Sequence, residues 1–184
     1  GRERFEPGNP QEGYSPSPQE RQSWLQISYM KEAYHTMGPK FTLGWMAEAL
    51  YSSKNFSENY TATMMQAGEF APTPHSKLMY NEAFRANQYV AAGIKPIYVL
   101  NDMFQFRTEF YGFTPIFPIK KNALNKAYYG KAFSRFEYMG EVSVICHLPF
   151  GAISAYVNHY SSPRREWNVG MTIGWQLFNY RFVE

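Results

Sequence analysis

Residues 104–110 read Phe-Gln-Phe-Arg-Thr-Glu-Phe, and no other stretch of the sequence decides the fold so clearly. Successive side chains of a β-strand point to opposite faces. In such a strand Phe104, Phe106 and Phe110 share one face, while Arg107 and Glu109 share the other. The stretch therefore predicts a strand with one apolar face and one ionic face.

Similar alternation recurs along the chain, and about eight strand-like runs can be counted in all. They are residues 23–35, 40–51, 60–70, 88–100, 104–110, 133–147, 152–160 and 168–177. The third run has an alternative, because Asn59 could cap a short helix through residues 61–66. We expect a strand there.

The connections between these runs alternate in length. Tight turns are expected at Asn101-Asp102 and at residues 149–151, and both fall on the same end of the sheet. This pattern predicts an all-β fold: an antiparallel up-and-down meander that forms a transmembrane β-barrel or part of one. Residues 1–21 are rich in Pro, Gln, Glu and Gly and are expected to be a disordered linker or loop, with the barrel segment over 22–184.

Composition agrees with this class. The chain has 15 Tyr and 15 Phe, yet its mean hydropathy is -0.47. A membrane-spanning helix needs roughly 20 consecutive apolar residues, whereas a barrel strand needs only about 10 alternating ones. The net charge of +3 is too small to indicate nucleic-acid binding, and Lys120, Lys121, Lys126 and Lys131 are expected to form a solvated basic loop.

The alternation does not say which face points inward. A soluble barrel that binds an apolar ligand would bury the rings and expose the charges, and it is the alternative to a membrane barrel. Packing so many rings into a small barrel would be crowded, so we expect them outside, against lipid. The charged side chains Arg107, Arg135, Glu137 and Glu141 would then line the lumen.

Catalytic and metal sites are not indicated. The chain has no G-x-S-x-G nucleophile elbow, and its single aspartate, Asp102, lies in a predicted turn. The four histidines, His35, His75, His147 and His159, lack the close carboxylate or cysteine spacing of a metal site. Cys146 is expected to be an inert apolar thiol. We therefore expect no enzyme activity, no metal and no cofactor.

The last run resembles the C-terminal signal by which outer-membrane barrels are assembled. With the residues that follow it, this run is rich in aromatic and apolar side chains, among them Ile173 and Phe178, and the signal itself would comprise Trp175, Leu177, Tyr180 and Phe182, with Val183 and Glu184 after them. This resemblance implies recognition by the barrel assembly machinery and a location in the bacterial outer membrane.

Four internal motifs strengthen the resemblance to outer-membrane barrels: residues 84–89 (Phe-Arg-Ala-Asn-Gln-Tyr), 107–111 (Arg-Thr-Glu-Phe-Tyr), 138–141 and 148–151. Together they make residues 24–182 similar to the later half of the C-terminal barrel that the bacterial surface antigen family attaches to patatin-like phospholipases. The chain departs from that family at Ala86, where glycine is usual, and at Glu109, where aspartate is more usual.

The resemblance implies a latch in which Arg85, on an inward-folded loop, reaches Glu109 in the lumen. It also implies that the chain anchors an upstream patatin-like domain, or forms a pore that moves polypeptide or lipid. Any lipase activity would lie in that upstream domain. A half barrel has two open edges, so the chain would close on itself, self-associate through those edges, or be completed by a partner.

Overall fold

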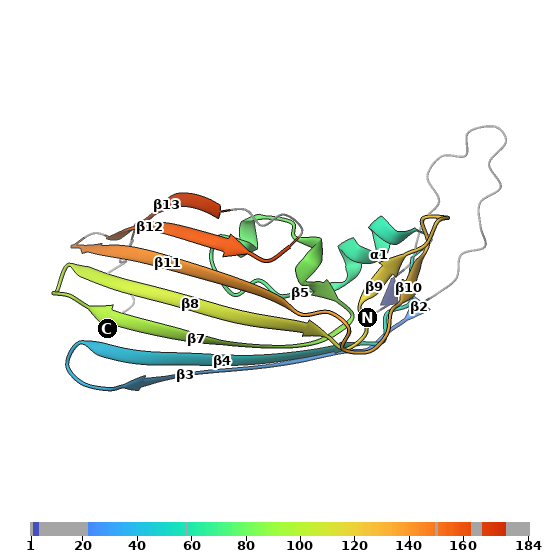
Figure 1. Ribbon diagram of the computed structural model, residues 1–184, viewed down its shortest axis with the longest axis horizontal. Coiled ribbons are helices and arrows are strands. Elements are labelled where there is room, and N and C mark those ends of the chain that lie inside the picture. The colour runs from blue at the N-terminus through green and yellow to red at the C-terminus, as the bar shows by residue number, and fades with distance from the viewer. Residues whose placement is uncertain (1, 4–21, 58, 150, 163–166, 176–184) are drawn as a thin grey trace, which may run out of the picture.

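The computed structural model describes residues 2–3, 22–57, 59–149, 151–162 and 167–175. Within these ranges the chain forms one large antiparallel sheet of seven strands, in the order β13-β12-β11-β8-β7-β4-β3 (Figure 1). The strands are β3 (Gln26–Thr36), β4 (Phe41–Ser52), β7 (Gln88–Val99), β8 (Phe104–Pro115), β11 (Glu137–Leu148), β12 (Gly151–Tyr160) and β13 (Trp167–Trp175). The predicted all-β antiparallel meander is confirmed.

Each strand of this sheet pairs with the next sheet strand along the chain, and the connections differ between the two ends. Residues 37–40, 100–103 and 149–150 connect strands at one end, whereas 53–87, 116–136 and 161–166 connect them at the other. The Asn101 side chain accepts hydrogen bonds from the backbone N–H groups of Met103 and Phe104, at 3.0 and 2.8 Å, which tightens that turn. The expected difference between a short-turn end and a long-loop end is therefore present.

The long connections contain the small elements. The strand pair β5 (Gly68–Glu69) with β6 (Arg85–Ala86), the helix α1 (Tyr60–Gln66), and the 3-10 turns η1 (Ser76–Leu78) and η2 (Glu82–Phe84) lie in 53–87. Strands β9 (Ile119–Lys121) and β10 (Ala127–Tyr129) pair within 116–136. Near the N-terminus, β1 (Arg2–Glu3) pairs with β2 (Gln22–Ser23). The predicted linker otherwise falls outside the described residues.

The expected strand over residues 60–70 is wrong, because α1 occupies Tyr60–Gln66. The Asn59 side chain accepts a hydrogen bond from the backbone N–H of Ala62 at 2.8 Å, which caps the first turn. The helix ends at Ala67, whose extended backbone leads into β5. Local capping thus prevails over the weak alternation of this run, and seven strands rather than about eight build the main sheet.

Most of the other predicted boundaries hold within about three residues, but β8 extends to Pro115 instead of ending at Phe110, and β11 starts later than predicted. Phe133 has a positive φ of 49°, a conformation that a bulky residue rarely adopts. The strand therefore begins at Glu137 rather than at Phe133. In the described part of the chain, no helix has the length and apolar character needed to cross a membrane.

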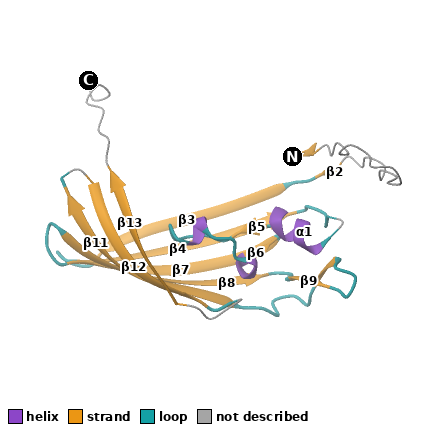
Figure 2. Ribbon diagram, turned by 90° about the horizontal axis from the view of Figure 1, so that it is seen from above, coloured by secondary structure: helices purple, strands orange, loops and turns teal. Residues whose placement is uncertain are grey.

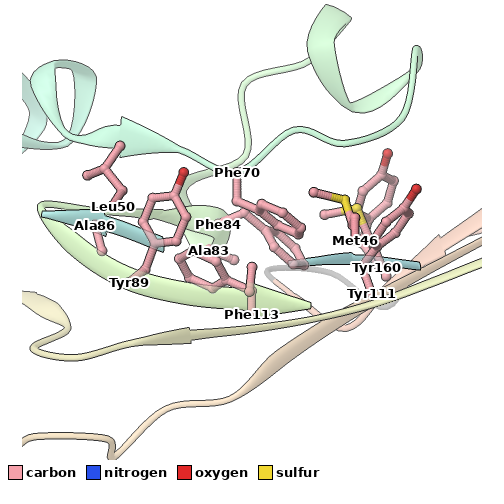
Figure 3. Close-up of a cluster of buried hydrophobic side chains, with 12 residues drawn as sticks. Met46, Leu50, Phe70, Ala83, Phe84, Ala86, Tyr89, Tyr111, Phe113 and Tyr160 are labelled. Carbon is pink, nitrogen blue, oxygen red and sulfur yellow. The ribbon is translucent and has the colours of Figure 1, made fainter. Parts of the chain in front are cut away.

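The sheet is curved, and the segment 53–87 lies in its hollow (Figure 2). We call this covered side the inner face and the opposite side the outer face. Aromatic side chains pack between the segment and the inner face, with Phe70 against Tyr89, Tyr111 and Phe113 (Figure 3). The cluster comprises Met46, Leu50, Phe70, Ala83, Phe84, Ala86, Tyr89, Ala91, Tyr111, Phe113, Met139 and Tyr160. The buried apolar core thus belongs to the inner segment and one face of the sheet.

Candidate functional site

The outer face is largely apolar, and each of the seven strands carries at least one large exposed side chain on it. Among the described residues, the strand registers place one Lys, Arg, Asp or Glu on it, Lys31, which lies over the ring of Trp45. Ile94, Phe110 and Val142, on the central strands β7, β8 and β11, are 49, 52 and 49% exposed. The large exposed side chains of this face are Ile27, Tyr29, Tyr51, Val90, Ile94, Tyr98, Phe104, Phe106, Phe110, Tyr138, Val142, Val157, Trp167, Val169, Met171 and Ile173.

Such a continuous surface is unusual for a protein in water. Water-soluble monomers rarely expose contiguous apolar patches beyond a few hundred Å², and larger patches mark contact with membranes or with other proteins. The central position of Ile94, Phe110 and Val142 shows that their exposure is not confined to the sheet edges.

The inner face carries most of the charged groups of the sheet. Lys95 forms an ion pair with Glu32, and Arg107 Nε lies 2.7 Å from Glu109 Oε1. Glu109 also accepts a hydrogen bond from the Tyr111 hydroxyl. Glu141 lies directly opposite Glu109 across the β8–β11 pairing. Buried charges are tolerated when they are paired, as Glu109 is with Arg107, whereas Glu141 faces a second carboxylate. The inner face thus combines these ionic groups with the aromatic cluster.

The four predicted lumen charges all lie on or beside this face. Glu137 and Glu141 are buried, while Arg107 and Arg135 are half-buried. Arg135 precedes β11, and its Nε lies 2.8 Å from Glu137 Oε1. The predicted charges therefore lie on the face opposite to Phe104, Phe106 and Phe110, and the inner face also carries the aromatic residues of the buried cluster.

The predicted latch between Arg85 and Glu109 is wrong. Arg85 forms an ion pair with Glu69, its direct partner in the β5–β6 register. Its guanidinium also donates to the backbone oxygens of Met64, Met65 and Ala67 at 3.3, 3.1 and 3.3 Å. Glu109 already has Arg107 two residues away on its own strand. Arg85 and Glu109 therefore each form an ion pair with a residue that is closer in the sequence, Glu69 and Arg107 respectively.

Arg85 therefore closes the inner segment on itself, and other contacts hold that segment to the sheet. The Tyr89 hydroxyl lies 2.6 Å from Glu48 Oε1 and 3.2 Å from the backbone oxygen of Glu69. His75 Nδ1 lies 2.9 Å from the Tyr160 hydroxyl, at the far side of the hollow. These contacts join residues far apart in sequence, and sequence reasoning identified none of them.

Three ionisable groups of the inner segment have shifted pKa values. Burial lowers the pKa of His75 from its usual 6.5, because the charged imidazolium loses hydration. Burial raises the pKa of Tyr80, and burial together with a hydrogen bond to Glu82 raises the pKa of Tyr60. All three groups therefore favour their neutral form.

The remaining sequence-based site predictions are placed only in part. Trp175 ends β13, whereas Leu177, Tyr180 and Phe182 lie outside the described residues. Within the described ranges, no three His, Cys, Asp or Glu residues gather as metal ligands would.

No family model, curated protein or solved structure gives a significant match to this chain. The likeness to the bacterial surface antigen family therefore depends on the quoted sequence motifs alone.

Proposed function

We propose that this chain is a β-barrel segment of the bacterial outer membrane, with its outer face in contact with lipid hydrocarbon. The observation that carries the proposal is the inverted polarity of the central strands. Exposing apolar surface to water costs roughly 25 cal/mol per Å², whereas hydrocarbon removes this cost. Charges on the inner face suit the polar interior that such barrels have.

The alternative of a soluble barrel with an apolar interior requires the opposite arrangement. Phe104, Phe106 and Phe110 would have to face the covered side of the sheet, and Arg107 and Glu109 would have to face water. In the described strands these side chains have the opposite orientation: the phenylalanines are exposed and the charged residues lie on the covered face. This orientation favours the membrane assignment over a soluble ligand-binding barrel.

Two features bear on what such a segment does. The sheet ends at two strands, β3 and β13, that are paired on one side only within the described part of the chain. In hydrocarbon an unpaired strand edge is costly, so further strands from the same protein or a partner would complete the barrel. The inner segment fills the hollow, which suits a plug or an anchor better than an open channel.

We therefore favour a membrane anchor over the translocation or insertion pore that the family resemblance also implies. An upstream patatin-like phospholipase domain and recognition by the barrel assembly machinery belong to the same proposal, and both come from the quoted motifs alone.

Detergent dependence tests the assignment. The full chain is refolded from urea into dodecylmaltoside micelles or into buffer without detergent, and its size and circular dichroism are measured. We expect monodisperse, β-structured protein in micelles and aggregation without them. Monodisperse, β-structured protein in plain buffer would contradict the membrane assignment and favour the soluble barrel.

A further inference from the structure

The connection between β8 and β11 is strongly basic. Residues 116–136, which we call the basic hairpin, contain four lysines and one arginine and no acidic residue. Arg135 is paired with Glu137, but the four lysines form no ion pair among the residues that the structure describes. Lys120, Lys121, Lys126 and Lys131 are all exposed. Their charge is therefore available to a partner.

Exposed aromatic rings accompany these lysines. Tyr128 and Tyr129 of β10 are 46 and 41% exposed, and Phe133 and Phe136 are 62 and 65% exposed. Mixed aromatic and basic side chains are typical of the membrane interface, where rings sit at the headgroup level and cations meet phosphates. Tyr129 also packs within the fold, on Phe56 and Phe117, whereas Phe133 and Phe136 are the most exposed of these rings.

The basic hairpin also borders the apolar outer face. It lies at the long-loop end of the sheet (Figure 1) and rejoins the sheet through Phe136, which lies over Gly112 of β8. A ring carbon of Phe136 is 3.1 Å from the point where a Cβ on Gly112 would stand. Beside Phe136, a shallow hollow of about 470 Å³ crosses the outer face over Ala47, Ala92 and Gly112. Phe136 thus connects the basic hairpin to the apolar outer face.

We propose that the basic hairpin binds the phosphate groups of anionic bilayer lipids, with the lysines at the headgroups and the rings at the edge of the hydrocarbon. This inference rests on the proposed function, because the outer face must contact lipid for the hairpin to lie at headgroup level. The charge complementarity, the exposed rings of the hairpin and the link through Phe136 to the apolar face favour a lipid. Binding of a nucleic acid would not involve the adjoining apolar surface.

The experiment uses the full chain folded in dodecylmaltoside micelles. Phosphatidylglycerol, phosphatidylcholine or soluble glycerol phosphate is added in increasing amounts, and retained lipid is measured by native mass spectrometry. The variants are the pairs Lys120→Gln with Lys121→Gln and Lys126→Gln with Lys131→Gln. The matched control is Lys40→Gln with Lys77→Gln, which removes two exposed lysines outside the basic hairpin.

We expect the wild-type chain to retain phosphatidylglycerol in preference to phosphatidylcholine, and not to retain glycerol phosphate. A lysine near an anionic surface strengthens binding about fivefold, so each hairpin pair should weaken phosphatidylglycerol binding about 25-fold. The control pair should change it less than about twofold. Retention of glycerol phosphate comparable to that of the lipid would show a simple phosphate site and contradict the proposal.

The remaining outcomes separate this inference from the proposed function. If both double variants of the hairpin fold in micelles and still bind phosphatidylglycerol as the wild type does, the lipid-binding proposal is wrong, while the membrane assignment stands. If the control double variant loses as much phosphatidylglycerol binding as the hairpin double variants, the lipid-binding proposal is also wrong, because binding would then depend on the total charge of the chain. Protein that folds only without detergent would overturn the membrane assignment and this inference together.

Discussion

Glu109 and Phe110 are neighbours on β8 and have opposite environments: the carboxylate residue is 3% exposed and the phenylalanine 52% exposed. In a sheet that packs one face on a soluble core, the ring would be buried and the carboxylate would face water. Because the same relation holds for Glu141 and Val142 on β11, at 5 and 49% exposed, the inversion extends over adjacent central strands.

Glu109→Gln should destabilise the sheet by removing the buried charge that pairs with Arg107. Breaking a buried ion pair can cost 3–5 kcal/mol, but Arg107 is partly exposed, so we expect about 1–3 kcal/mol. Urea unfolding of the micellar protein measures the change. The double variant Arg107→Gln with Glu109→Gln should be less destabilised than the sum of the two single variants. A stability of Glu109→Gln equal to wild type would contradict the pairing.

Glu69→Gln should loosen the inner segment, whereas Glu109→Gln should not. Glu69 is the partner that holds Arg85 and thereby closes β5 on β6. We expect limited proteolysis to cleave Glu69→Gln within 53–87 several times faster than wild type, while Glu109→Gln is cleaved at close to the wild-type rate. Faster cleavage in Glu109→Gln than in Glu69→Gln would restore the Arg85–Glu109 latch that the sequence motifs imply.

Phe70→Ala should cost about 3–5 kcal/mol, because it leaves a cavity in a packed aromatic cluster. Phe70 is 1% exposed, and its ring is stacked on Phe113 with centroids 5.9 Å apart. The matched control is Phe110→Ala on the outer face, for which we expect less than half of that loss in micelles. Unfolding midpoints of the two variants decide the comparison, and equal losses would mean that the inner cluster is not the core.

Acid should destabilise the contact between His75 and Tyr160. Burial lowers the pKa of His75, so the folded chain resists a proton that the unfolded chain accepts. Stability is therefore greatest above the usual pKa of 6.5 and declines as pH falls from there toward the lowered pKa. Unfolding midpoints of the wild type should fall more between pH 7 and pH 5 than those of His75→Gln. Parallel profiles would show that His75 does not titrate with folding.

The sequence predicted much of the sheet and little of what fills it. A period of two made β8 and most of β11 recognisable, because rings and charges alternate there without interruption. The alternation separates the residues of a strand into two faces, but it does not show which of these faces the rest of the chain covers. That decision depends on the inner segment, whose two-residue strands are too short to carry an alternating pattern.

The helix α1 and the Arg85–Glu69 pair were missed for different reasons. Residues 60–66 contain Tyr and two Thr, which favour strands, and only the Asn59 cap indicated a helix. Arg85 was assigned to a distant carboxylate on motif likeness, although Glu69 lies nearer in the chain. Long-range contacts such as His75 with Tyr160 leave no local signal in the sequence.

The direction of the outer face can be measured most directly on β12, where Ser154 faces the inner side and Ala155 the outer side. A Cys146→Ser chain, which lacks its single native cysteine, receives Ser154→Cys or Ala155→Cys and a fluorescent label, and is placed in bilayers with quenchers on the lipid acyl chains. Strong quenching at residue 155 and weak quenching at residue 154 is the predicted result. Equal quenching at both positions, or stronger quenching at residue 154, would contradict a lipid-facing outer surface.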